Sequence, residues 1–115
     1  MASARFYAEP LDDSTALVAV TGELDIGNTR ELRRCFEAAL REGRFRIVVD
    51  LSEVSHLDSS GLAELITANQ RLHDLHGGIA LVVTSTPLAR TLEIRGVDGL
   101  FTVAPTRAEA VASLP

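Results

Sequence analysis

The stretch VVDLSEVSHLDSSGL, residues 48–62, joins the pattern of a strand to the pattern of a helix through a short polar segment. Apolar side chains occupy every second position of residues 45–51, and Val48 adds one on the other face, which predicts a central strand covered on both sides. From Ser59, apolar residues recur at a helical period until His-Gly-Gly at residues 76–78. A strand that passes directly into a helix is typical of an α/β fold.

The flanking sequence repeats this alternation of strands and helices. It predicts strands at residues 5–9, 16–21, 79–83 and 100–103, and helices at residues 29–42, 86–96 and 107–112. The complete order is strand, strand, helix, strand, helix, strand, helix, strand, helix. Alternating strands and helices require parallel pairing through right-handed crossovers, whereas the first two strands form an antiparallel hairpin. The sequence therefore predicts an α/β fold in which helices pack on a mixed, mostly parallel β-sheet.

Capping patterns mark the starts of three of these helices. Asn28 and Glu31 have the spacing of a capping box, and so do Thr106 and Glu109. Thr86 is predicted to cap the helix at residues 86–96, because a proline follows it at a position where a missing N–H costs no helical hydrogen bond.

Length and composition favour one soluble domain. The chain has 115 residues, of which 46% are hydrophobic, so residues 1–115 are expected to form a single domain. Its apolar runs are far shorter than the about 20 residues of a membrane span, and residues 1–10 lack the order of a secretory signal. We therefore expect a cytoplasmic protein that does not bind a membrane.

Charge and metal-ligating residues argue against nucleic acid and metal ions as ligands. The net charge is −5, and the eleven basic residues, all arginine, are scattered rather than gathered on a face that phosphates would need. The three histidines do not have the spacing of a zinc site, and Cys35 fits a buried helix face. We expect no metal site and no direct contact with nucleic acid.

Acidic residues and a serine follow two of the predicted strands. Glu23 and Asp25 come after the second strand, and Asp58 and Ser59 come after the third. Because the carboxyl ends of parallel strands lie at one edge of a sheet, these four residues share that edge if the two strands are neighbours. Helix N-termini point to the same edge, where ligands and partners of α/β sheets bind.

The segment Asp58-Ser59-Ser60 allows three interpretations. Any of its residues can cap the helix that follows. A nucleophilic serine needs a base and an oxyanion hole, but the only nearby base is His56 on the same predicted loop, and there is no G-x-S-x-G elbow. A phosphate on a serine at a helix N-terminus adds charge without unfolding the helix, which makes a switch. The residues alone leave cap and switch open and disfavour a hydrolase.

Four segments in this order resemble the STAS domain family, and within it the small single-domain anti-sigma factor antagonists. They are VTGELD at residues 20–25, VVDLSEVSHLDSSGL at residues 48–62, GGIALVV at residues 77–83 and LEIRGVDGLFTVAPTRAEAV at residues 92–111. Because the resemblance runs nearly end to end, it implies that residues 1–115 are one STAS domain.

The resemblance implies a partner-switching function in the regulation of transcription, often in a stress response. Antagonists of this type bind an anti-sigma factor that is also a serine kinase, and they thereby release a sigma factor. The kinase uses ATP to phosphorylate the antagonist, which breaks the complex, and a PP2C-type phosphatase restores it. The antagonist itself would be neither an enzyme nor the holder of a cofactor.

The family's functional residues can be placed on this chain through the matched segments. The resemblance assigns Ser59 as the phosphorylated residue and Ser60 as a less favoured acceptor. The surface offered to the kinase would include Glu23, Asp25, Asp58, Ser60, Gly61 and Leu62. Two residues depart from the family pattern Gly-Leu-Gly followed by an apolar residue: Ala63 replaces the second glycine, and Glu64, if exposed, would add negative charge to this surface.

Two alternative functions follow from the same residues. The chain could be a STAS scaffold or an accessory subunit of a stress-sensing or lipid-transport complex, with no phosphorylation switch. It could also be a small hydrolase that uses Ser59 with His56, although we expect no such activity.

Overall fold

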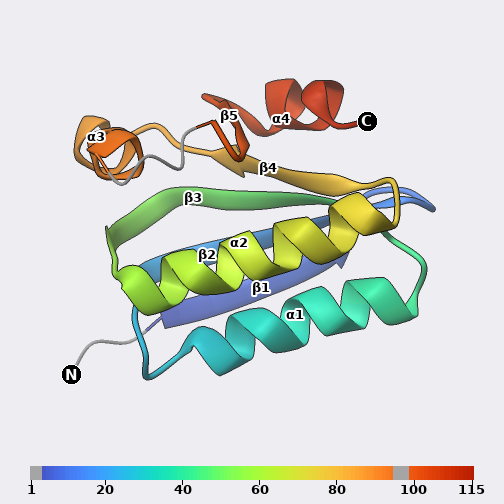
Figure 1. Cartoon of the computed structure of the whole chain (residues 1–115), viewed down its shortest axis with the longest axis horizontal. Helices are drawn as coiled ribbons and strands as arrows, with labels where there is room; N and C mark the ends of the chain where they lie inside the picture. The colour runs from blue at the N-terminus through green and yellow to red at the C-terminus, as the bar shows by residue number, and fades with distance from the viewer. Residues whose placement is uncertain (1–3, 95–98) are drawn as a thin grey trace.

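A single five-stranded sheet carries four helices in residues 4–94 and 99–115, which the computed structural model describes (Figure 1). The elements are β1 Ala4–Pro10, β2 Thr15–Leu24, α1 Thr29–Arg41, β3 Arg46–Leu57, α2 Ser59–Asp74, β4 Gly78–Val82, α3 Thr86–Ile94, β5 Thr102–Ala104 and α4 Arg107–Ser113. The strands lie in the order β1-β2-β3-β4-β5. β1 is antiparallel to β2 and the other neighbours are parallel, which confirms the predicted mixed, mostly parallel α/β sheet.

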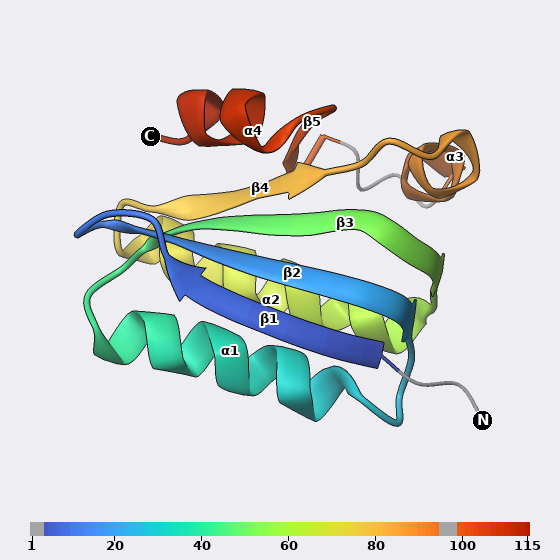
Figure 2. The ribbon, with the colours of Figure 1, turned by 180° about the vertical axis from the view of Figure 1, so that it is seen from behind.

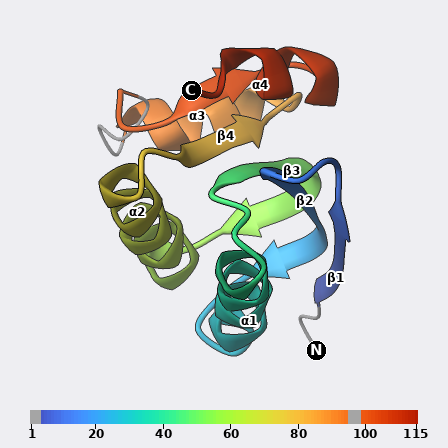
Figure 3. The ribbon, with the colours of Figure 1, turned by 90° about the vertical axis from the view of Figure 1, so that its right-hand side faces the viewer.

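Helices cover the two faces of this sheet unequally. α1 and α2 pack side by side on one face, where α1 contacts β1 and β2 and α2 contacts β3 and β4 (Figure 1 and Figure 3). α4 packs over β3, β4 and β5 on the opposite face (Figure 2). None of the helices in the described residues is both long and apolar enough to cross a membrane.

Strand alternation divides the buried side chains into two cores. Val18 and Val49 point toward α1 and α2 and are almost completely buried. Leu17 and Val48 precede them in the chain, point the other way and pack with Leu114 after α4. β3 is therefore covered on both faces, as its apolar pattern predicts.

β3 is longer than the sequence predicts. It ends at Leu57 instead of Leu51, and Leu57 pairs with Leu24 of β2. Val54 and Leu57 are buried, whereas the polar residues between them are exposed. The β2–β3 register shifts on either side of the Thr21–Gly22 pairs, and the φ of Gly22 is 102°. This irregularity breaks the strict alternation by which the strand could be followed in the sequence.

The structure confirms one predicted helix cap and replaces another. The Thr106 hydroxyl accepts a hydrogen bond from the Glu109 N–H at 3.1 Å, as predicted for α4. At α3 the predicted cap Thr86 is wrong, because the Leu88 N–H donates to Ser85 Oγ at 3.2 Å and Thr86 is already helical. Serine is as good a cap as threonine, so the two neighbouring hydroxyls could not be distinguished by type.

The start of the last strand differs from the prediction, and the end of the third helix is not described. The last strand begins at Thr102 instead of residue 100, and Phe101 before it is buried in the larger core. The predicted end of the third helix, Gly96, lies outside the described residues.

The turn from α2 to β4 passes directly over the residue before β3. Gly77 N–H donates to Leu72 O at 2.7 Å, and Gly78 N–H donates to Phe45 O at 3.0 Å. A Cβ on Gly77 would lie 1.8 Å from Phe45 O and 2.6 Å from Phe45 C, which no real side chain tolerates. Gly77 is therefore required by close approach of two backbones.

Gly77→Ala is expected to destabilise the fold by about 3 kcal/mol, because a backbone segment must move to admit the methyl group. Gly99→Ala is the matched control, since a Cβ there meets nothing within 4 Å. Urea unfolding followed by circular dichroism measures both free energies of unfolding. Equal stability of the two variants would contradict the close approach at Gly77.

An ion pair ties α4 to β3. Arg107 Nε donates to Asp50 Oδ2 at 2.6 Å, and the Ser52 N–H donates to Asp50 Oδ1 at 2.9 Å. Burial raises the pKa of the Asp50 carboxyl, but the hydrogen bonds from Ser52 and Arg107 together outweigh it, so the net pKa lies below its usual value. The ionised form of Asp50 therefore stabilises the folded chain.

This pKa predicts a pH-dependent difference between the wild-type protein and Asp50→Asn. A carboxyl whose folded pKa is depressed contributes stability above its unfolded pKa, about 3.9, and loses it as the pH falls through the lower folded pKa. We expect the wild-type protein to be more stable by about 1 kcal/mol at pH 7, with the difference shrinking below about pH 4. Chemical unfolding at several pH values measures it, and a constant difference would contradict the depressed pKa.

Candidate functional site

The carboxyl ends of β2 and β3 meet at one edge of the sheet. The two strands pair in parallel as far as Glu23 opposite His56 and Leu24 opposite Leu57, and the Asp58 N–H donates to Leu24 O at 3.1 Å. The β2–α1 loop and the start of α2 therefore lie side by side (Figure 1). We call Glu23, Asp25 and Asp58 at this edge the acidic rim.

Asp58 begins the helix that carries the two serines. Its backbone is extended, with φ −91° and ψ −178°, and its Oδ1 accepts a hydrogen bond from the Gly61 N–H at 3.0 Å. The cap is thus Asp58, one of the three residues that could cap, and Ser59 and Ser60 are the first two helical residues. Ser59 is exposed and Ser60 is partly buried.

Gly61 brings the first turn of α2 onto the strand ends. A Cβ on Gly61 would lie 2.7 Å from Leu57 Cδ1 and 3.1 Å from Leu24 Cβ, so the helix contacts both strands closely. Leu62 beside it is 6% exposed. Gly61 and Leu62, which the sequence predicted at a partner-binding surface, are therefore both buried and position the exposed residues around them.

The β2–α1 loop is held by its own side chains. Asn28 Oδ1 accepts from the Asp25 N–H at 3.1 Å, Asn28 Nδ2 donates to Glu23 O at 2.7 Å, and Asp25 Oδ1 accepts from the Gly27 N–H at 2.8 Å. The predicted capping box of Asn28 is wrong, because its side chain binds this loop rather than the first turn of α1. These three hydrogen bonds fix the path of the loop.

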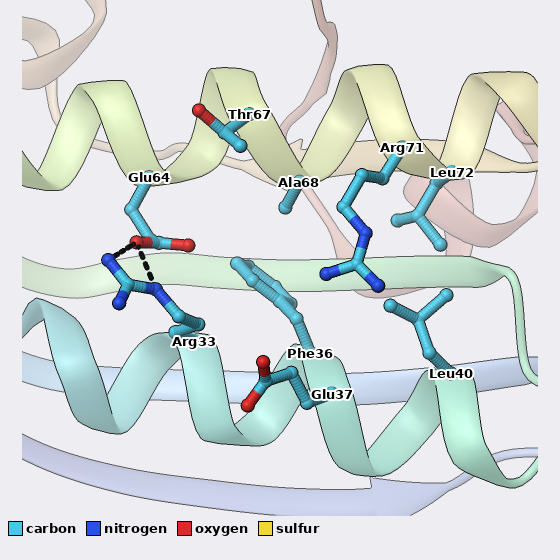
Figure 4. A pocket seen from close by; sticks show the side chains of 9 residues that line it. All are labelled: Arg33, Phe36, Glu37, Leu40, Glu64, Thr67, Ala68, Arg71 and Leu72. Atoms are coloured by element: carbon cyan, nitrogen blue, oxygen red, sulfur yellow. Dashed lines mark hydrogen bonds and ion pairs between the residues drawn. The ribbon is translucent and has the colours of Figure 1, made fainter.

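Glu64 does not add free negative charge to the site. Its side chain is 9% exposed, and its Oε1 accepts from Arg33 Nε at 3.0 Å and from Arg33 Nη2 at 2.8 Å (Figure 4). The condition under which Glu64 would add negative charge to the surface is therefore not met. Arg33 and Glu64 instead form an ion pair that links α1 to α2.

An open groove lies between the N-terminal halves of α1 and α2, next to the β2–α1 loop. Its volume is 390 Å³, and it is lined by Ile26, Thr29 and Arg33 on one side and by Ser60, Glu64 and Thr67 on the other. A smaller pocket of 80 Å³ follows beyond the Arg33–Glu64 pair, where Phe36 and Leu72 close the space between the helices (Figure 4). We call the larger space the α1–α2 groove. No local pattern in the sequence indicates this groove, since it depends on how two helices pack.

His56 lies in β3 rather than on a loop with Ser59. It is exposed and precedes the buried Leu57, after which Asp58 and Ser59 follow. The predicted loop position of His56 in the hydrolase alternative is therefore wrong, because β3 continues to Leu57.

Solved structures with the same fold include anti-sigma factor antagonists. An anti-sigma factor antagonist from Mycobacterium paratuberculosis is 27% identical, with a TM-score of 0.84 over 96% of this chain and 93% of that protein. The phosphorylated form of the Bacillus cell fate determinant SpoIIAA, at 21% identity, matches with a TM-score of 0.69 over 94% of this chain and 97% of that protein, which shows the shared fold.

Sequence comparison agrees with the structures. The anti-sigma-B factor antagonist of Staphylococcus aureus is 30% identical over 86 residues, which are 75% of this chain and 80% of that protein. The family model described as "Mlab, STAS domain" matches residues 7–103. The chain belongs to the STAS domain family.

Proposed function

We propose that this chain is an anti-sigma factor antagonist whose binding to an anti-sigma factor serine kinase is ended by phosphorylation of Ser59. The observation that carries the proposal is the place of Ser59. Ser59 is an exposed residue at the first position of α2, directly after Asp58, in a STAS chain whose relatives include anti-sigma factor antagonists.

The local geometry supports phosphorylation without unfolding. A phosphate on the first residue of a helix lies at the positive end of the helix dipole, where anions are stabilised. Asp58 caps α2 through the Gly61 N–H. The modified chain would keep this cap and its fold, so the effect of the phosphate would fall on the surface around it.

The acidic rim supports the direction of the switch. Asp25 and Asp58 would contact basic groups of the kinase, with Glu23 nearby. Phosphorylation adds a charge of about −1.5 to −2 beside these carboxylates, together with the bulk of the phosphate. A kinase surface fitted to the unmodified hydroxyl would then be repelled or sterically blocked.

Ser60 fits less well as the acceptor. It is partly buried and lines the α1–α2 groove, whereas Ser59 is exposed. A protein kinase needs the accepting hydroxyl to reach its own active site, so the more exposed serine is the better substrate.

On this proposal the chain acts as a substrate and a competitor, as a single domain in the cytoplasm, and has no enzymatic activity of its own. The kinase supplies ATP and its catalytic groups, and a PP2C-type phosphatase removes the phosphate. The release of a sigma factor follows because the antagonist and the sigma factor compete for the same anti-sigma factor.

Phosphate mapping tests the acceptor. Each anti-sigma factor serine kinase of the source organism is incubated with the protein and ATP, and the modified residue is identified by mass spectrometry. We expect one phosphate, on Ser59, and none in Ser59→Ala. Modification of neither Ser59 nor Ser60 by any of these kinases would reject the switch.

Binding measurements test the effect of charge at the acceptor. Ser59→Asp is expected to bind the kinase at least tenfold more weakly, a cost of about 1.4 kcal/mol, whereas Ser59→Ala stays bound in the presence of ATP. Ser113→Asp is the control, since it adds the same charge on α4, on the opposite face of the sheet. A stable complex whose affinity ignores Ser59→Asp would favour the scaffold alternative instead.

A further inference from the structure

Ile26 is held outward beside the acidic rim. The residue is 80% exposed, more than any other large apolar residue that the structure describes. One exposed apolar residue is ordinary on a protein surface, so exposure alone says little. Its surroundings distinguish it.

The backbone on both sides of Ile26 is fixed. Asp25 before it donates its N–H to Asn28 Oδ1, and Gly27 after it donates its N–H to Asp25 Oδ1. The Asn28 N–H also donates to Asp25 O at 3.1 Å, which closes the turn. Ile26 therefore cannot fold back into the core without breaking these hydrogen bonds. An apolar side chain on a rigid loop loses little further freedom when a partner covers it.

Ile26 also forms one end of the α1–α2 groove, and Ser60 lies on the opposite wall. Since Ser60 follows Ser59 directly, the groove is continuous with the surface around the proposed phosphorylation site. The Arg33–Glu64 ion pair lies along the same groove and joins its two walls. A partner that covers Ser59 and extends along the groove would reach Ile26.

We infer that Ile26 is an apolar anchor for the anti-sigma factor, which would cover it with a small apolar hollow ringed by arginine or lysine side chains. This inference rests on the proposed function and adds a contact that does not depend on phosphorylation. The basic ring follows from the acidic rim, because complementary charges around an apolar contact favour the correct partner. A second copy of this chain fits poorly, since it would bring two acidic rims together.

Ile26 and Ser59 have different roles in the proposed complex. Ile26 contributes affinity by removing apolar surface from water, whereas Ser59 decides whether the complex forms at all. Complete burial of an isoleucine side chain corresponds to about a tenfold to hundredfold change in the dissociation constant. Because Ile26 makes so little contact within the monomer, its replacement should leave the fold unchanged.

Titration calorimetry with the purified anti-sigma factor that binds wild-type protein tests the inference. Ile26→Ser is expected to weaken binding by at least tenfold, and Ile26→Leu is expected to keep near wild-type affinity. Leu11→Ser is the matched control, since Leu11 is a 43% exposed apolar residue in the β1–β2 turn, at the other end of β2. Circular dichroism verifies that each variant is folded.

The outcomes separate this inference from the proposed function. Wild-type affinity of Ile26→Ser, combined with weak binding of Ser59→Asp, would overturn the anchor and keep the switch. Binding of no anti-sigma factor by the wild-type protein would overturn both. Sedimentation of the wild-type protein as a dimer that Ile26→Ser converts to a monomer would assign Ile26 to contact between copies and would also overturn the anchor.

Discussion

The parallel pairing of β2 with β3, continued to the last residue of each strand, is the constraint on which the site depends. Leu24 pairs with Leu57, and the next residue, Asp58, donates its N–H to Leu24 O. This contact leaves no room for a side chain at Gly61, where the helix turns over both strand ends. The pairing of these two buried leucines makes the β2–α1 loop and the serines at the start of α2 neighbours. More than thirty residues separate this loop from the serines in the chain.

Local patterns in the sequence were sufficient to predict the order and type of the elements. The apolar residues of β3 around Val48 and the glycines after α2 are signals of short range, and they identify a strand, a helix and a turn. The end of β3, residues 52–57, is not predicted by the sequence. Val54 and Leu57 lie three positions apart, and only the pairing with β2 shows that both point inward. Strand order is also a property of the whole sheet. The sequence therefore predicts that the acidic residues and Ser59 share an edge only on the condition that β2 and β3 are neighbours.

Side-chain partners were the least predictable part of the site. In the sequence alone, Asn28 matches a helix cap, and Glu64 is a charged residue with no predicted partner. In the structure each binds a group whose position depends on the fold: Asn28 binds the strand end at Glu23, and Glu64 binds Arg33 on the other helix. The partners of polar residues depend on how the elements pack, because a buried or half-buried polar atom needs a hydrogen bond and forms it with whichever group the fold places nearby.

The same arrangement fits the proposed switch on a small, tightly packed domain. The start of α2 is fixed by the Asp58 cap and by Gly61, which are half-buried and buried. A charge added to the Ser59 hydroxyl meets the favourable end of a helix dipole, so it costs the fold little. In the proposed complex, a bound partner would have to accept the same charge next to the carboxylates that it contacts. Phosphorylation of Ser59 would therefore weaken the proposed complex more than it destabilises the domain.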